Sequence, residues 1–136
     1  MPSRRFTLEQ AESLLPRLAH LLLEIRKLNT QHDGLQERLV ALSLRMRSNG
    51  HALETQLARA RQAAEEKASA LRRMIDRVHE MGCERKDIDQ GLVDFRTLKD
   101  GQEVYLCWRL GEPRIVWWHP LEAGFAGRRP LEMGEE

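Results

Sequence analysis

An apolar stripe at helical spacing in the first third of the chain constrains its fold most. Apolar residues recur there every three or four positions, or after one whole heptad, as on one face of an amphipathic helix. They are Leu8, Ala11, Leu15, Leu18, Leu22, Ile25, Leu28, Leu35, Leu39, Leu42 and Met46. Because the phase survives Asp33 and Gly34, we expect one mostly continuous helix. Pro16 should kink it, since proline removes a backbone hydrogen bond.

Local signals mark where this helix begins and where the chain turns back. Thr7 is a suitable N-cap, Gln10 completes a capping box, and Phe6 precedes the cap. Ser48-Asn49-Gly50 is a turn signal. A second stripe then follows as Leu53, Leu57, Ala60, Ala64, Leu71, Ile75 and Val78. Gly82 is placed to end the second helix, so the sequence predicts an antiparallel helical hairpin over residues 7–82.

The remaining segment, residues 83–136, is predicted to form a small antiparallel sheet and a C-terminal tail. Three stretches have the β-branched and aromatic content or the flanking turn residues of strands, namely 91–95, 103–110 and 114–119. We therefore expect an α+β fold with about three strands, in a single domain over residues 1–136.

The register of the last two strands stays open at this level. A three-residue loop would put Trp108 and Trp118 on one face, whereas a four-residue loop would pair Trp108 with Trp117. Tryptophans on a short sheet most often form its core, and a stacking surface for a ligand is the alternative.

Composition narrows the classes of partner. The net charge is +1, whereas a nucleic-acid binder presents a strongly basic face, so nucleic acid is an unlikely partner. The longest aliphatic run, at residues 21–23, is far too short to cross a membrane. The two cysteines, Cys83 and Cys107, suit free thiols in a reducing compartment, so we expect a cytoplasmic protein.

Sequence motifs occur at both ends of the chain. The N-terminal motif is FTLE at residues 6–9 with LLP at 14–16. The C-terminal motif is GLVDF at 91–95, EVYLCWRLGE at 103–112, WH at 118–119 and GFAGR at 124–128. Together they resemble an uncharacterised bacterial family, domain of unknown function 2203. That family typically has proline where this chain has Arg96. The resemblance implies the architecture and a bacterial cytoplasmic setting, and it implies no mechanism.

The polar residues of the C-terminal motif are the candidate ligand-binding residues. They are Asp94, Arg109, His119 and Arg128. A buried Arg109 would need Asp94 as its partner, because an unpaired buried charge costs several kcal/mol. In the functional interpretation, the two arginines hold a carboxylate or phosphate beside His119. In the favoured structural interpretation, an ion pair fixes the order of the strands.

Metal-ligating patterns are sparse. His79 and Cys83 have the four-residue spacing of two ligands on one helix face, and His119 is a third candidate metal ligand. No second Cys/His pair follows, so a solvated, charged loop after the second helix is favoured. No motif indicates a cofactor, a phosphate-binding loop or a catalytic nucleophile.

These features lead to three functional hypotheses. The favoured one is a non-enzymatic interaction protein that forms a homodimer or docks a protein partner through its helical hairpin. The second is a small-molecule (anion) or metal-binding protein that uses a pocket on the sheet. The third is a weak nucleic-acid binder.

Overall fold

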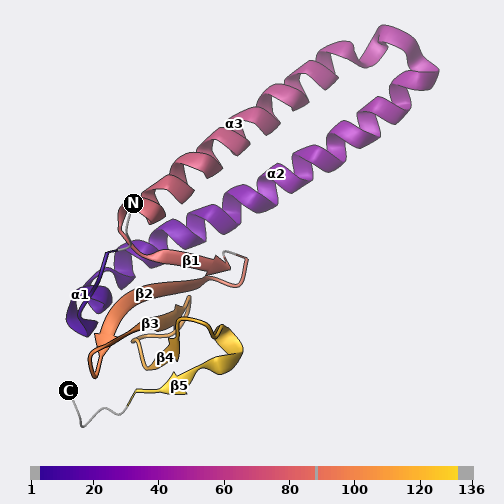
Figure 1. The fold of residues 1–136 in the computed structure, drawn as a ribbon. Coiled ribbons are helices and arrows are strands. Elements are labelled where there is room, and N and C mark those ends of the chain that lie inside the picture. Colours follow the sequence, from indigo (N-terminus) through magenta and orange to yellow (C-terminus); the bar gives the residue numbers. More distant parts are fainter. Residues whose placement is uncertain (1–3, 88, 132–136) are drawn as a thin grey trace. The chain divides into compact units, whose positions relative to one another are not determined.

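The computed structural model describes residues 4–87 and 89–131 and has an α+β fold (Figure 1). The helices come first: α1 (Leu8–Ser13), α2 (Leu15–Asn49), the 3-10 helix η1 (Gly50–Leu53) and α3 (Glu54–Glu80). The strands follow: β1 (Glu84–Asp87), β2 (Leu92–Lys99), β3 (Gln102–Arg109), β4 (Trp117–Pro120) and β5 (Arg129–Pro130), with the 3-10 helix η2 (Phe125–Gly127) between the last two. No helix in the described ranges is long and apolar enough to cross a membrane.

The chain divides into two compact units. One unit combines Met1–Leu23 with Asp76–Glu136, and the other is Glu24–Ile75. The second unit is the helical hairpin, in which α2 and α3 are antiparallel and η1 joins them. Its apolar cluster consists of Leu42, Leu53, Leu57 and Ala60, with Leu39 and Met46 packed against it. The predicted leucine stripe is therefore used, in this part, to hold the two arms of the hairpin together.

The N-terminal helix is interrupted close to the predicted kink. The capping box is confirmed, because Thr7 Oγ1 accepts from the Gln10 backbone N–H and the Gln10 side chain accepts from the Thr7 N–H. α1 ends at Ser13 and α2 begins at Leu15, just before Pro16. Pro16 has no N–H and its ring crowds the carbonyl four residues earlier, which explains the break. As expected, α2 continues through Asp33 and Gly34.

The sheet is antiparallel, with the strand order β1-β2-β3-β4-β5. The three predicted strands are present, and β1 and β5 add to them. β3 pairs with β4 through Leu106 opposite Trp118 and Cys107 opposite Trp117. This register puts Trp118 on the same face as Trp108, as the three-residue loop predicted. However, β4 begins only at Trp117, so the connection is longer than either alternative.

The two faces of the sheet differ in chemistry. One face, which we call the apolar face, carries Val93, Phe95, Val104, Leu106, Trp108 and Trp118. It packs against the N-terminal segment, where the Phe6 and Phe95 rings make an edge-on contact with centroids 5.3 Å apart. The opposite face, which we call the polar face, carries Asp94, Arg96, Tyr105, Cys107 and His119. Side chains alternate between the faces because successive strand residues point in opposite directions.

Candidate functional site

Three potential metal ligands meet on the polar face. Asp94 on β2 lies opposite Cys107 on β3, and His119 on β4 lies opposite Tyr105, diagonal to Cys107. A carboxylate oxygen, the Cys107 Sγ and a ring nitrogen of His119 all lie within 4.8 Å of one another. The three residues are 0%, 1% and 0% exposed. The strand register therefore brings an oxygen, a sulfur and a nitrogen ligand together inside the protein.

The hydrogen bonds of His119 fix the orientation of its ring. Its Nδ1 lies 2.9 Å from the Pro120 carbonyl oxygen. Because a carbonyl oxygen only accepts, Nδ1 carries a proton and donates it. The other ring nitrogen, Nε2, lies 3.2 Å from Asp94 Oδ1. One proton is consequently shared between Nε2 and the Asp94 carboxylate.

Cys107 is a protonated thiol in this environment. Burial raises its pKa to about 11, and the nearby Asp94 carboxylate adds to the shift while the Arg128 guanidinium opposes it. A thiolate would be the metal-binding or nucleophilic form. A cation is therefore needed to stabilise the thiolate at neutral pH.

Arg128 lies at the edge of this cluster. Its Nη2 donates to Glu112 Oε1 at 2.7 Å and reaches the Cys107 carbonyl oxygen at 3.4 Å. Its guanidinium also lies over the Trp117 ring, 5.1 Å from the centroid. Glu112 therefore balances the charge of Arg128, and the arginine contacts both the backbone of β3 and the Trp117 ring of β4.

A network of charged and polar side chains lies beside the cluster. Tyr105 OH donates to Glu84 at 2.8 Å and accepts from Arg96 at 2.9 Å. Burial, and then the Glu84 carboxylate, raise the pKa of Tyr105 to about 12. The Tyr105 ring lies 5.3 Å from the His119 ring, so the network and the cluster share a boundary.

The structure brings together three of the four predicted ligand-binding residues and leaves the fourth exposed. Asp94, His119 and Arg128 gather around Cys107, but Arg109 is exposed at the end of β3. Because Arg109 is not buried, its charge does not require Asp94 as a buried partner. Its position is opposite Leu92, where β2 begins, so the strand pair ends there. The Asp94 carboxylate instead forms a hydrogen bond with His119 on the polar face of the sheet.

The structure does not bring His79 and Cys83 together on one helix face. α3 ends at Glu80, and Gly82 follows with φ of +88°, so the helical spacing does not extend to Cys83. His79 is exposed, whereas Cys83 is buried and donates to the Val78 carbonyl oxygen at 3.4 Å. Burial raises the pKa of Cys83 to about 11. The region expected to be a loop also contains β1.

Sequence reasoning missed Cys107 as a member of the cluster. It was considered only as a free thiol, because a cysteine in an apolar strand usually behaves as a small hydrophobic residue. The available signal was that Asp94 and Cys107 are potential ligands within two strands whose other residues are largely apolar. Only the register of β2 and β3 aligns these two positions.

The chain matches a known family model. The model of the family described as uncharacterized conserved protein (DUF2203) matches residues 4–131. No curated protein and no solved structure matches the chain.

Proposed function

We propose that this chain, which belongs to the DUF2203 family of uncharacterized conserved proteins, binds a divalent metal ion of the zinc class. The ligands are Asp94, Cys107 and His119. The observation that carries the proposal is the convergence of their three ligand atoms within 4.8 Å, all in buried side chains. The family match itself supplies no activity, so the argument rests on this geometry.

The set of donor atoms favours zinc over magnesium or calcium. Thiolate and imidazole ligands suit zinc and similar transition metals, whereas Mg²⁺ and Ca²⁺ prefer oxygen. His119 donates its Nδ1 proton to a backbone carbonyl. This is the usual way in which a metal-ligating histidine is held with its other nitrogen directed at the metal. The ion would take the place of the proton now shared by Nε2 and Asp94.

Charge balance also supports a divalent ion. A Cys107 thiolate and an Asp94 carboxylate together carry two negative charges, which one divalent cation neutralises. Without the ion, two adjacent buried anions would be costly. Metal binding would release the Cys107 proton, so affinity should rise with pH.

The burial of the ligands favours a structural rather than a catalytic ion. Structural zinc usually has four protein ligands, whereas three ligands, as here, leave the fourth position to water. The ligands are 0–1% exposed, so a substrate has no access to that position. An ion at this point would join β2, β3 and β4. The proposal is thus a non-enzymatic, metal-stabilised protein. Its two free thiols support a reducing compartment such as the bacterial cytoplasm as its location.

Cobalt substitution tests this site. Protein loaded with Co²⁺ should show a sulfur-to-cobalt charge-transfer absorption band, which the Cys107→Ser variant loses. Cys83→Ser is the matched control, because Cys83 is the other buried cysteine, and it should keep the band. Zn²⁺ at a hundred times its dissociation constant should stabilise the wild type by about 2.7 kcal/mol in thermal unfolding.

Two results would reject the metal site. One is the absence of both the absorption band and the zinc-dependent stabilisation in wild type. The other is a band that survives Cys107→Ser and disappears in Cys83→Ser. Circular dichroism of each variant establishes that a lost band does not reflect unfolding, and His119→Gln provides a second disrupted site.

A second candidate function is self-association through the hairpin. Val40 and Leu44 lie one turn apart on α2 and are 61% and 54% exposed. They border a shallow groove of about 310 Å³ that Leu39, Arg47 and Arg61 also line. Exposed apolar side chains in such a position often mark an interface. We propose that a second copy of the chain covers this patch.

Light scattering after gel filtration tests self-association. Wild type should elute as a dimer, and the double variant Val40→Glu/Leu44→Glu as a monomer. Arg38→Gln, an exposed change on the opposite face of the same helix, should leave the dimer intact. A monomeric wild type at high concentration would exclude this function without affecting the metal site.

A further inference from the structure

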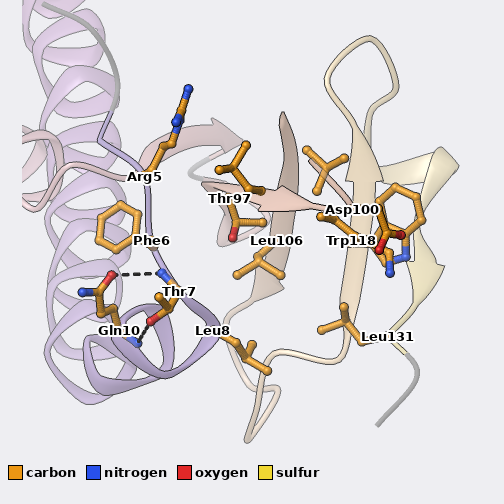
Figure 2. A pocket seen from close by; sticks show the side chains of 13 residues that line it. Arg5, Phe6, Thr7, Leu8, Gln10, Thr97, Asp100, Leu106, Trp118 and Leu131 are labelled. Carbon is orange, nitrogen blue, oxygen red and sulfur yellow. Dashed lines mark hydrogen bonds between the residues drawn. The ribbon is translucent and has the colours of Figure 1, made fainter. Parts of the chain in front are cut away.

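A cavity lies on the opposite side of the sheet from the ligand cluster. It has a volume of about 510 Å³ and lies between the N-terminal segment and the apolar face, within one compact unit. Figure 2 shows Phe6 and Leu8 on one side of it and Leu106 and Trp118 on the other. Cavities of this size typically hold a small molecule.

The inner part of the cavity is apolar. Phe6, Val104 and Leu106 line it and are 3%, 6% and 4% exposed. The backbone N–H groups of Thr7 and Gln10 already form hydrogen bonds in the capping box, each with the side chain of the other residue, so they are not free to bind a ligand (Figure 2). A ligand would therefore meet hydrocarbon here and few free hydrogen-bonding groups.

The wall at Trp118 carries positive charge. Lys99 Nζ lies 5.4 Å and the Arg129 guanidinium 5.3 Å from the Trp118 ring centroid. In the part of the chain that the structure describes, neither cation has a carboxylate within 4.0 Å. Arg5 also lines the cavity, but it is paired with Glu103 at 2.8 Å.

Among the described residues, the two cations at the Trp118 ring outnumber the one unpaired carboxylate that lines the cavity by one charge. Lys99 and Arg129 contribute two positive charges, and Asp100, which lines the cavity, contributes one negative charge. A monoanion would neutralise the remainder. An apolar interior next to a single net positive charge matches an amphipathic carboxylate, in which a hydrocarbon body ends in one acidic group.

We propose that this cavity binds a small amphipathic carboxylate, with its apolar body between Phe6 and Leu106 and its carboxylate at Lys99 and Arg129. The cations that surround Trp118 hold the acidic group, and the tryptophan covers the hydrocarbon next to it. The body is either an acyl chain or an aromatic ring. This site is independent of the proposed metal site at Asp94, Cys107 and His119, since the two lie on opposite faces of the sheet.

Titration calorimetry with decanoate and with 2-naphthoate tests the proposal. At least one of the two should bind wild type, and the tighter probe identifies the body as acyl or aromatic. Decyltrimethylammonium, which has the same chain length as decanoate and the opposite charge, should not bind. Lys99→Glu and Arg129→Glu should each weaken carboxylate binding about tenfold or more, because a lost ion contact of about 1.4 kcal/mol corresponds to that factor.

Lys27→Glu is the matched control, because it makes the same charge change on α2 at a residue that does not line the cavity. It should leave the affinity unchanged. Backbone and indole NMR shifts caused by the probe should centre on Trp118, Lys99 and Leu106. The proposal is overturned if neither carboxylate binds at millimolar concentration, if the ammonium probe binds equally well, or if both glutamate variants bind like wild type. Shifts confined to residues 24–75 would also overturn it.

Discussion

Arg96 connects four segments that are distant in the sequence. Its guanidinium donates to Glu84 on β1, to Glu103 and Tyr105 on β3, and it shares Glu103 with Arg5. Its carbonyl oxygen accepts from the Phe6 N–H at 2.8 Å. The side chain is 22% exposed, so these bonds are partly shielded from water and worth more than surface ion pairs.

Arg96→Ala should therefore destabilise the protein by about 1–2 kcal/mol, because it removes the guanidinium that donates to Glu84, Glu103 and Tyr105. Urea unfolding followed by tryptophan fluorescence measures this change. Arg5→Ala removes only the more exposed end of the network and should have the smaller effect. Equal effects of the two substitutions would contradict the central position of Arg96.

The Cys83 thiol makes stability depend on pH in the alkaline range. Its pKa is raised by burial from 9.0 to about 11, so the folded state holds the proton that the unfolded state loses first. The contribution of the protonated Cys83 thiol to the free energy of unfolding is fully present below pH 9. It is lost as the pH rises through 11, by at most about 1.4 kcal/mol per pH unit. Cys83→Ala should show a smaller loss of unfolding free energy over this interval than wild type. Superimposable pH profiles would rule out the effect, since Cys107 is common to both proteins.

Among the elements, the end of α3 depends on a glycine that no other residue can replace without strain. Gly82 has a φ of +88°, and a Cβ there would lie 2.9 Å from Arg4 Cδ and 3.0 Å from Arg4 Cβ. Gly34 lies inside α2, and a Cβ there would meet nothing within 4 Å. The same substitution should thus act in opposite directions at the two positions.

Gly82→Ala should lower the free energy of unfolding by about 1 kcal/mol or more, because the left-handed backbone and the close approach of Arg4 both oppose a side chain. Gly34→Ala should raise it by about 0.5–1 kcal/mol, since alanine restricts the unfolded chain in a helix interior. Urea midpoints of the two variants measure the difference. Shifts of the same sign would contradict this account of the helix end.

The sequence predicted the elements whose signals are local. The signals for the capping box at Thr7, for the apolar stripe through α2 and for the strands predicted at 91–95 and 103–110 each lie within a short stretch of sequence. β1 was missed because Glu84–Asp87 has no apolar alternation, and only its pairing with β2 makes it a strand. The Asp94, Cys107 and His119 cluster was assembled only in part, because it depends on the register of three strands, which local sequence does not fix.

At the scale of the whole molecule, the two compact units differ in the size of their apolar core. The unit Glu24–Ile75 buries the side chains Ile25, Leu42, Leu53, Leu57, Ala60 and Ala64. The other unit buries most of the remaining core, including the largest fully buried side chains, such as Trp108 and Phe95. Local stability follows buried apolar contact, so the hairpin is expected to open more easily than the sheet.

Hydrogen exchange followed by mass spectrometry should show this difference. Amides of residues 30–70 should exchange through openings of lower free energy than amides of β2 and β3. Zn²⁺ should slow exchange in β2, β3 and β4 and leave the hairpin unchanged, since the proposed ligands lie on those strands. Uniform protection along the chain would indicate one cooperative unit.

The path of the chain has an implication for how this protein can vary. The chain leaves the sheet-bearing unit after Leu23 and re-enters it at Asp76, so the hairpin is inserted between two segments of that unit. Removing matched turns from α2 and α3 would shorten the insertion while leaving the ligand cluster and the cavity with their complete sets of residues. Related chains could therefore differ widely in total length and still conserve the same binding chemistry, with the length difference confined to the tip of the hairpin.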